Sequence, residues 1–167
     1  MKHPLRFAYF ILALSALLTA AGCGSKSKMK DEDMVMARFL LEASEGEAFA
    51  TVTLPVSGVQ IAINTKPAVT EFDFTGVELA QSDLGQFIVF NLTGDASRDV
   101  YRLTGNNQGK RLVLFIAGKP VGARMIERPF NTGSIAIFAA LPEEELPELV
   151  KKMNDTSVEL QRRIAKE

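Results

Sequence analysis

Histidine and cysteine carry much of the nucleophilic, acid–base and metal-binding chemistry of proteins, and this chain has one of each. His3 and Cys23 both lie within the first 23 positions. The sequence after Cys23 therefore cannot build a histidine-based triad, a Cys–His pair, a thiolate metal site or an internal disulfide from its own side chains. Carboxylate chemistry and Ser–Lys pairs remain open.

Two further motifs resemble chemical sites. The consecutive acids Glu143, Glu144 and Glu145 would point in three directions on a helix, so we interpret them as a solvated cluster that complements the helix dipole. The stretch GNNQGK, from Gly105 to Lys110, is one residue too short for a phosphate loop, lacks Ser or Thr after the lysine and follows a predicted helix. We therefore expect no catalytic residue, no metal site and no cofactor, and a protein that is not an enzyme.

Basic side chains are concentrated in one part of the sequence. The formal net charge is -1, which argues against a nucleic-acid partner. Residues 42–95 carry eight acids and one base, whereas residues 96–128 carry seven bases and two acids. One interpretation is that neighbouring strands from the two segments neutralise each other. The other is a basic partner-binding face formed by Arg98, Arg102, Lys110, Arg111, Lys119, Arg124 and Arg128.

The N-terminus has the pattern of a secretory signal. Lys2 and Arg6 precede an apolar run of 15 residues, which is shorter than the roughly 20 residues of a membrane-spanning helix. The following LTAAGC resembles the bacterial lipobox, with Ala20 where that pattern prefers Leu. We predict a lipoprotein signal peptide over residues 1–22 and lipidation of Cys23, which would hold the chain at a membrane. An ordinary signal peptide and an uncleaved anchor are the alternatives.

Residues 23–33 are polar and of mixed charge, which predicts a short flexible tether. Its three lysines (Lys26, Lys28 and Lys30) could touch anionic headgroups. In the lipoproteins of Gram-negative bacteria, a residue other than Asp after the lipidated Cys implies outer-membrane sorting, and Gly24 stands there. We expect an extracytoplasmic, lipid-anchored protein, in the outer membrane facing the periplasm if the host is Gram-negative.

The elements that would position any site begin after this tether. Alternating and apolar runs bounded by turn signals predict strands over 34–42, 48–54 and 59–63. The segments 69–74 and 77–82 are more polar and suit edge strands or extended connections.

The stretch from Gln86 to Ile126 supplies much of the expected core. Residues 87–92 predict a strand covered on both faces. Thr93 suits the N-cap of a helix whose apolar stripe is Ala96, Val100 and Leu103. Residues 112–116 (LVLFI) then predict a buried strand, and Ala117-Gly118 predicts a hairpin turn into residues 121–126.

The remaining chain predicts a strand over 134–140 and a helix that begins near Pro142. Asn154 to Ser157 interrupts the apolar pattern, so we predict a domain over 34–154 and a separate short C-terminal helix over 155–167. The expected fold class is α+β, with a mixed or antiparallel sheet and two main helices packed on one face.

The central stretch resembles the first periplasmic head domain of the protein-translocase subunit SecD. That family has a helix ending in Leu-Thr, a polar link, Gly-Lys, an apolar strand and a hairpin, and then a Gly, an apolar strand and an acidic helix. The matching pieces here are Leu103-Thr104, Asn106-Asn107, Gly109-Lys110, Leu112 to Ile116, Gly133, Ile135 to Phe138 and Glu143-Glu144. The resemblance covers roughly residues 36–153.

This sequence departs from the family at Ala117-Gly118, Ala123-Arg124 and Ala139, which stand where the family has Asp-Gly, Ala-Pro and Gly. SecD couples an ion gradient to late protein translocation through a bundle of transmembrane helices. The sequence here shows no such bundle, so the motor function does not carry over.

The combined prediction is a non-catalytic, lipid-anchored envelope protein whose SecD-head-like domain binds protein, an envelope complex or unfolded polypeptide. A carrier or sensor of a small or lipidic ligand is the alternative, since the 11 Phe residues could line a cavity between sheet and helices.

Overall fold

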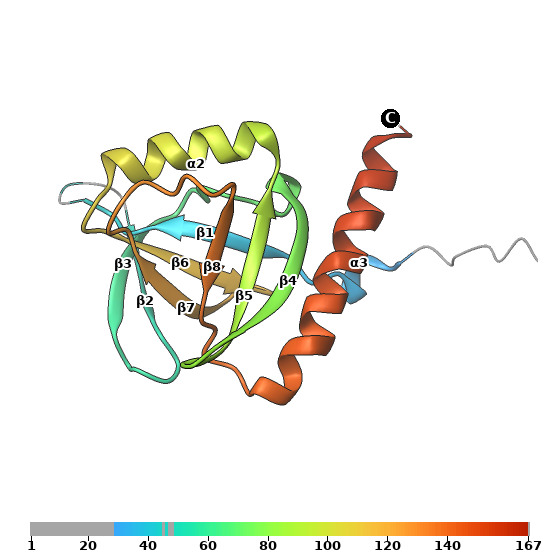
Figure 1. Ribbon diagram of the computed structural model, residues 1–167, viewed down its shortest axis with the longest axis horizontal. Helices are drawn as coiled ribbons and strands as arrows, with labels where there is room; N and C mark the ends of the chain where they lie inside the picture. The colour runs from blue at the N-terminus through green and yellow to red at the C-terminus, as the bar shows by residue number, and fades with distance from the viewer. Residues whose placement is uncertain (1–28, 45, 47–48, 167) are drawn as a thin grey trace, which may run out of the picture.

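The computed structural model describes residues 29–44, 46 and 49–166 (Figure 1). The predicted signal peptide over 1–22 and Cys23 lie outside the described residues. The strands are β1 (Ala37–Leu41), β2 (Phe49–Thr53), β3 (Gln60–Asn64), β4 (Phe74–Ser82), β5 (Gly85–Leu92), β6 (Arg111–Ile116), β7 (Lys119–Met125) and β8 (Ser134–Ile137). The helices are α2 (Gly94–Asn106) and α3 (Leu146–Ile164), with single 3₁₀ turns η2 (Asp31–Asp33), η3 (Glu71–Asp73) and η4 (Glu143–Glu145).

The described strands form three small antiparallel sheets, and the predicted α+β class is confirmed (Figure 1). One sheet has the order β1-β6-β7 and another has the order β4-β5-β8, while β2 and β3 pair as a separate hairpin. β6 and β5 are the central strands of the two larger sheets, as their continuous apolar sequences predict. β7 and β8 are edge strands, one from each sheet.

The main core lies between the two larger sheets and is built around three aromatic rings. Phe39 of β1 meets Phe90 of β5 edge-on at a centroid distance of 5.0 Å, and Phe74 lies 5.0 Å from Phe90. Edge-to-face rings at such distances add to the stability gained from burial alone. Both helices contribute to this core, α2 through Ala96 and α3 through residues that include Leu146.

The second face of the β1-β6-β7 sheet is covered by the β2–β3 hairpin. Leu40 of β1 and Val113 of β6 pack there against Ile61 and Ile63 of β3. Side chains of a strand alternate between faces, so an apolar run such as LVLFI needs a cover on each side. The main core covers one face of this sheet, and the β2–β3 hairpin covers the other face.

Helix α2 begins as predicted and fixes the loop between β7 and β8. The Thr93 hydroxyl accepts a hydrogen bond from the Ala96 amide at 3.2 Å, which satisfies one of the open N–H groups of the first turn. Near the other end, the buried Thr104 hydroxyl donates to the Val100 carbonyl at 2.7 Å. The same hydroxyl accepts from the Phe130 amide at 2.9 Å. This contact holds the β7–β8 loop against the helix.

Helix α3 is continuous over 19 residues, so the prediction of a break at Asn154–Ser157 and of a separate helix over 155–167 is wrong. The polar side chains in this stretch satisfy backbone groups of other elements. The Asn154 amide accepts from Val77 N–H at 2.9 Å and donates to Val77 C=O at 2.7 Å, so it pairs with the edge of β4. The Thr156 hydroxyl accepts from Val35 N–H at 2.9 Å.

The end of the predicted tether is also ordered on α3. Arg163 donates to the Met29 carbonyl at 3.0 Å and to the Asp31 carboxylate at 2.6 Å. Residues 29–33 therefore lie against the domain instead of forming a flexible link, because Arg163 binds the backbone carbonyl of Met29 and the carboxylate of Asp31. Among the described residues, no helix is long and apolar enough to cross a membrane.

Candidate functional site

The candidate site is the groove between the edge strands β7 and β8, which we call the β7–β8 groove. The segment that follows β8 closes one end of the groove, where Ala140 N–H donates to Val121 C=O of β7 at 2.6 Å. A methyl group on Gly122 would lie 2.4 Å from the Phe138 carbonyl oxygen, so only glycine permits this approach. No ladder joins the strands beyond that point in the described sheets, and they diverge.

Backbone groups of β8 face into the groove. Residues of an antiparallel strand bond alternately to one neighbour and to the other. Leu92 N–H of β5 donates to Gly133 C=O. Every second residue after Gly133 also bonds to β5, so Ile135 pairs with Phe90 and Ile137 pairs with Ile88. The backbone of Ala136 therefore faces away from β5 and toward β7.

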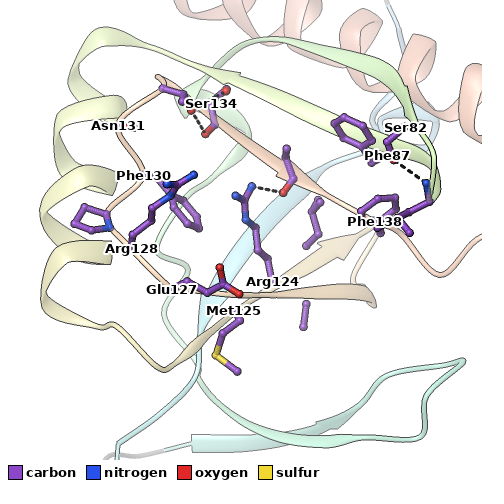
Figure 2. A pocket seen from close by; sticks show the side chains of 16 residues that line it. Ser82, Phe87, Arg124, Met125, Glu127, Arg128, Phe130, Asn131, Ser134 and Phe138 are labelled. Atoms are coloured by element: carbon purple, nitrogen blue, oxygen red, sulfur yellow. Dashed lines mark hydrogen bonds between the residues drawn. The ribbon is translucent and has the colours of Figure 1, made fainter.

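Arg124 of β7 bridges the two edges. Its Nη1 donates to the Ala136 carbonyl at 2.5 Å, and its guanidinium carbon lies 4.5 Å from the centre of the Phe130 ring. Figure 2 shows this side chain pointing from β7 toward β8, with Phe130 beside it. Burial lowers the pKa of Arg124, the charge of Arg128 lowers it further, and Glu127 opposes both. The guanidinium is thus a partly desolvated cation, and one of its five donors holds the Ala136 carbonyl.

The hollow beside Arg124 has a volume of about 570 Å³. Its other end is apolar, since the rings of Phe87 and Phe138 lie 5.5 Å apart there. Met125 lies in the wall, and Leu84 stands at the rim with its side chain exposed. The groove therefore combines a cationic end with an aromatic end, as the labelled side chains in Figure 2 show.

The structure distributes the seven residues of the predicted basic face over several places. Arg124 and Arg128 line the β7–β8 groove. Arg98 and Arg102 lie on α2 beside a neighbouring hollow of about 350 Å³ that shares Phe130 with the groove. Each is paired on the helix surface, Arg98 with Asp95 and Arg102 with Asp99, so their charge is largely compensated.

The other three basic residues lie elsewhere. Lys110 donates to the Ser44 hydroxyl. Arg111 binds the Glu42 carboxylate through Nε at 2.9 Å, and this hydrogen bond lowers the pKa of Glu42 and raises that of Arg111. Lys119 lines a third hollow beside α3. The Arg111–Glu42 pair fits the alternative in which neighbouring strands neutralise each other.

The aromatic lining of the groove was not singled out from the sequence. Phe87 lies on the face of β5 opposite to the buried Ile88, and Phe138 follows the end of β8. Period-two alternation could have placed Phe87 on the outer face, but the distance between edges of two different sheets is not encoded in any local pattern. Within the described part of the chain, no three acidic side chains gather as a metal site would require.

The chain is thus an α+β domain with a groove between the edges of two of its sheets. No protein-family model matches the chain, and no curated protein matches it. Its fold is similar to solved structures of SecDF. One, described as a membrane component that enhances protein export, has a TM-score of 0.57 and 18% identity, over 74% of this chain and 63% of that one.

A second solved structure, SecDF in a super-membrane-facing form, also has a TM-score of 0.57 and 18% identity. The match covers 75% of this chain and 19% of that one. The chain thus spans less than two thirds of either protein. What the two proteins share with it is a SecDF-like domain fold.

Proposed function

We propose that this chain is a non-catalytic, lipid-anchored extracytoplasmic protein that binds extended polypeptide in the β7–β8 groove. The observation that carries the proposal is the pair of diverging edge strands, with the backbone of Ala136 facing the gap: its carbonyl is bound by Arg124, and its N–H points toward β7. An extended segment can add to a sheet edge through main-chain hydrogen bonds, while pockets for alternate side chains supply selectivity. The β7–β8 groove offers a strand edge for main-chain hydrogen bonds and a hollow for side chains, both within the length of a few residues.

The two ends of the groove specify the kind of segment that fits. Phe87 and Phe138 at one end suit an aliphatic or aromatic side chain. Arg124 suits a carboxylate, because a desolvated guanidinium gains most from a charged acceptor. We therefore propose segments in which an acidic residue stands a few positions from a large apolar one.

The anchor and the location rest on the sequence. The signal pattern and LTAAGC favour cleavage before Cys23 and lipidation of that residue, and the similarity to SecDF is in keeping with a place outside the cytoplasm. Mass spectrometry of the mature N-terminus tests the anchor. An unmodified Cys23, or retention of residues 1–22, would contradict it.

Site-specific photo-crosslinking in cells tests the groove. A photoreactive residue replaces Met125 or Phe138, whose side chains are 48% and 46% exposed, and the matched control replaces Tyr101 on α2, which is 51% exposed. Because exposure is similar at the three positions, differences in adduct yield report on location. We expect polypeptide adducts from the two groove positions and few from Tyr101.

The proposal would fail if the groove positions gave no protein adduct under native expression, or if all three positions reacted alike. A second candidate function is a carrier or sensor of a small or lipidic ligand, and the aromatic end of the 570 Å³ hollow favours it. Native mass spectrometry of the purified protein separates the two. A copurifying small molecule that is lost in the Phe138→Ala variant would support the carrier.

A further inference from the structure

We propose that the C-terminal half of α3, together with residues 29–35, forms a seat that faces the phospholipid surface and holds the domain close to it. We call residues 29–35 the strap. The proposal rests on the lipidation of Cys23 proposed above. It adds the orientation and the distance of the domain relative to the bilayer.

The strap is fixed to α3 at two points. Arg163, in the last turn of α3, binds the Met29 carbonyl at 3.0 Å and Asp31 at 2.6 Å. About two turns earlier along the helix, Thr156 accepts from the Val35 amide at 2.9 Å. The chain therefore leaves the domain beside α3 (Figure 1).

The length of chain between the anchor and the strap limits the distance from the bilayer. A freely extended link from Cys23 to Met34 would span eleven residue steps, or about 38 Å. With the strap bound, the link ends at Met29 after six steps, so it reaches about 20 Å at most. The strap thus halves the reach of the domain from the membrane.

The surface near this exit point suits a lipid interface. Val158 and Ile164 on α3 are 66% and 52% exposed. Two of the three acids of the strap form ion pairs, since Asp31 binds Arg163 and Glu32 lies 3.4 Å from Lys30. Exposed aliphatic side chains beside paired charges can pack at the interfacial layer. The β2–β3 hairpin lies on the opposite side of the domain from α3 (Figure 1).

Energy transfer to labelled lipids tests the seat in the full-length lipidated protein. Cys23 is the only cysteine, so a donor can be attached at a single introduced cysteine once Cys23 carries its lipids. The donor is placed at Lys166→Cys, just after α3, or at Val56→Cys in the β2–β3 turn. The vesicles contain phosphatidylethanolamine and phosphatidylglycerol with acceptor headgroups. We expect higher transfer efficiency from position 166 than from position 56.

The Arg163→Ala variant should release the strap and lower the transfer efficiency from position 166. Arg102→Ala on α2, which also removes an arginine from a helical ion pair, should leave that efficiency unchanged. Mass spectrometry confirms lipidation in each sample. Equal transfer from positions 56 and 166 in lipidated protein overturns the seat alone, whereas an unmodified Cys23 overturns the anchor and the seat with it.

Discussion

Replacing Asn154 by alanine removes the two hydrogen bonds that join α3 to the edge of β4. The side-chain amide accepts from Val77 N–H at 2.9 Å and donates to Val77 C=O at 2.7 Å. Val77 is a buried core residue, so the alanine variant leaves a backbone donor and a backbone acceptor without these partners. The variant therefore measures how strongly α3 is held on the sheet.

The expected size follows from the two bonds. Each neutral hydrogen bond contributes about 1 kcal/mol net, so their loss costs about 2 kcal/mol. Alanine has the higher helix propensity, which returns roughly 0.5 kcal/mol. We expect a net loss of about 1.5 kcal/mol in the free energy of unfolding. In a chain of this size the melting temperature falls by about 5 °C.

Urea denaturation followed by circular dichroism measures the change, in a Cys23→Ser background that lacks the site of lipidation. Asp155→Ala is the matched control, because Asp155 is exposed in the same turn of α3 and gains the same propensity. It should be neutral or slightly stabilising. Asn154→Asp keeps the size and one acceptor but sets a carboxylate against Val77 C=O, so it should also destabilise at neutral pH.

Equal unfolding free energies for Asn154→Ala and Asp155→Ala would refute the argument that this amide substitutes for a neighbouring strand. An Asn154→Asp variant as stable as the unmodified protein at pH 7 would do the same, since the orientation of the amide dipole would then be irrelevant.

Four further outcomes are expected. Thr93→Ala should cost about 1 kcal/mol in urea unfolding, because the α2 N-cap is lost. Hydrogen bonds from arginines hold the pKa values of Glu42 and Glu71 below 4.5. The two carboxylates therefore contribute stability that is present above pH 4.5 and is lost as the pH falls through their lower folded-state pKa values. The urea unfolding midpoint should fall over that pH range. Gly122→Ala should lower the melting temperature, because the added methyl group meets the β8 side of the groove. Arg124→Gln should reduce crosslinking to acidic segments in the groove more than it reduces the melting temperature, and an equal loss of both would assign Arg124 a structural role alone.

Much of the fold could be predicted from local patterns. The central strands β5 and β6 were predicted from apolar runs, and the start of α2 from Thr93. The sequence also predicts the turn at Ala117-Gly118, through Gly118, which adopts a φ of 77°; Ala117 adopts a φ of 49°, which alanine rarely does. These features depend on residues that are neighbours in the chain.

The break predicted at Asn154–Ser157 is absent from α3, because the contacts that decide it are made with residues far away in the sequence. Asn and Thr disfavour helix interiors because their side chains compete for nearby backbone groups. Here their partners are Val77 and Val35, both far away in sequence, so the side chains support the helix they would otherwise interrupt. The same applies to residues 29–33, whose polar composition predicts a tether and whose contacts with Arg163 make them part of the strap.

By itself the sequence determined the α+β class, the main strands and the absence of histidine and cysteine chemistry after Cys23, because composition and local periodicity suffice for these. Only the tertiary structure decided where the charges and aromatic rings meet. It divided the seven basic residues among several places, and it brought Arg124 of one sheet edge to Ala136 of another. The physical reason is that the β7–β8 groove exists only where two separate sheets pack together. No local sequence pattern determines the distance between the edges of those two sheets.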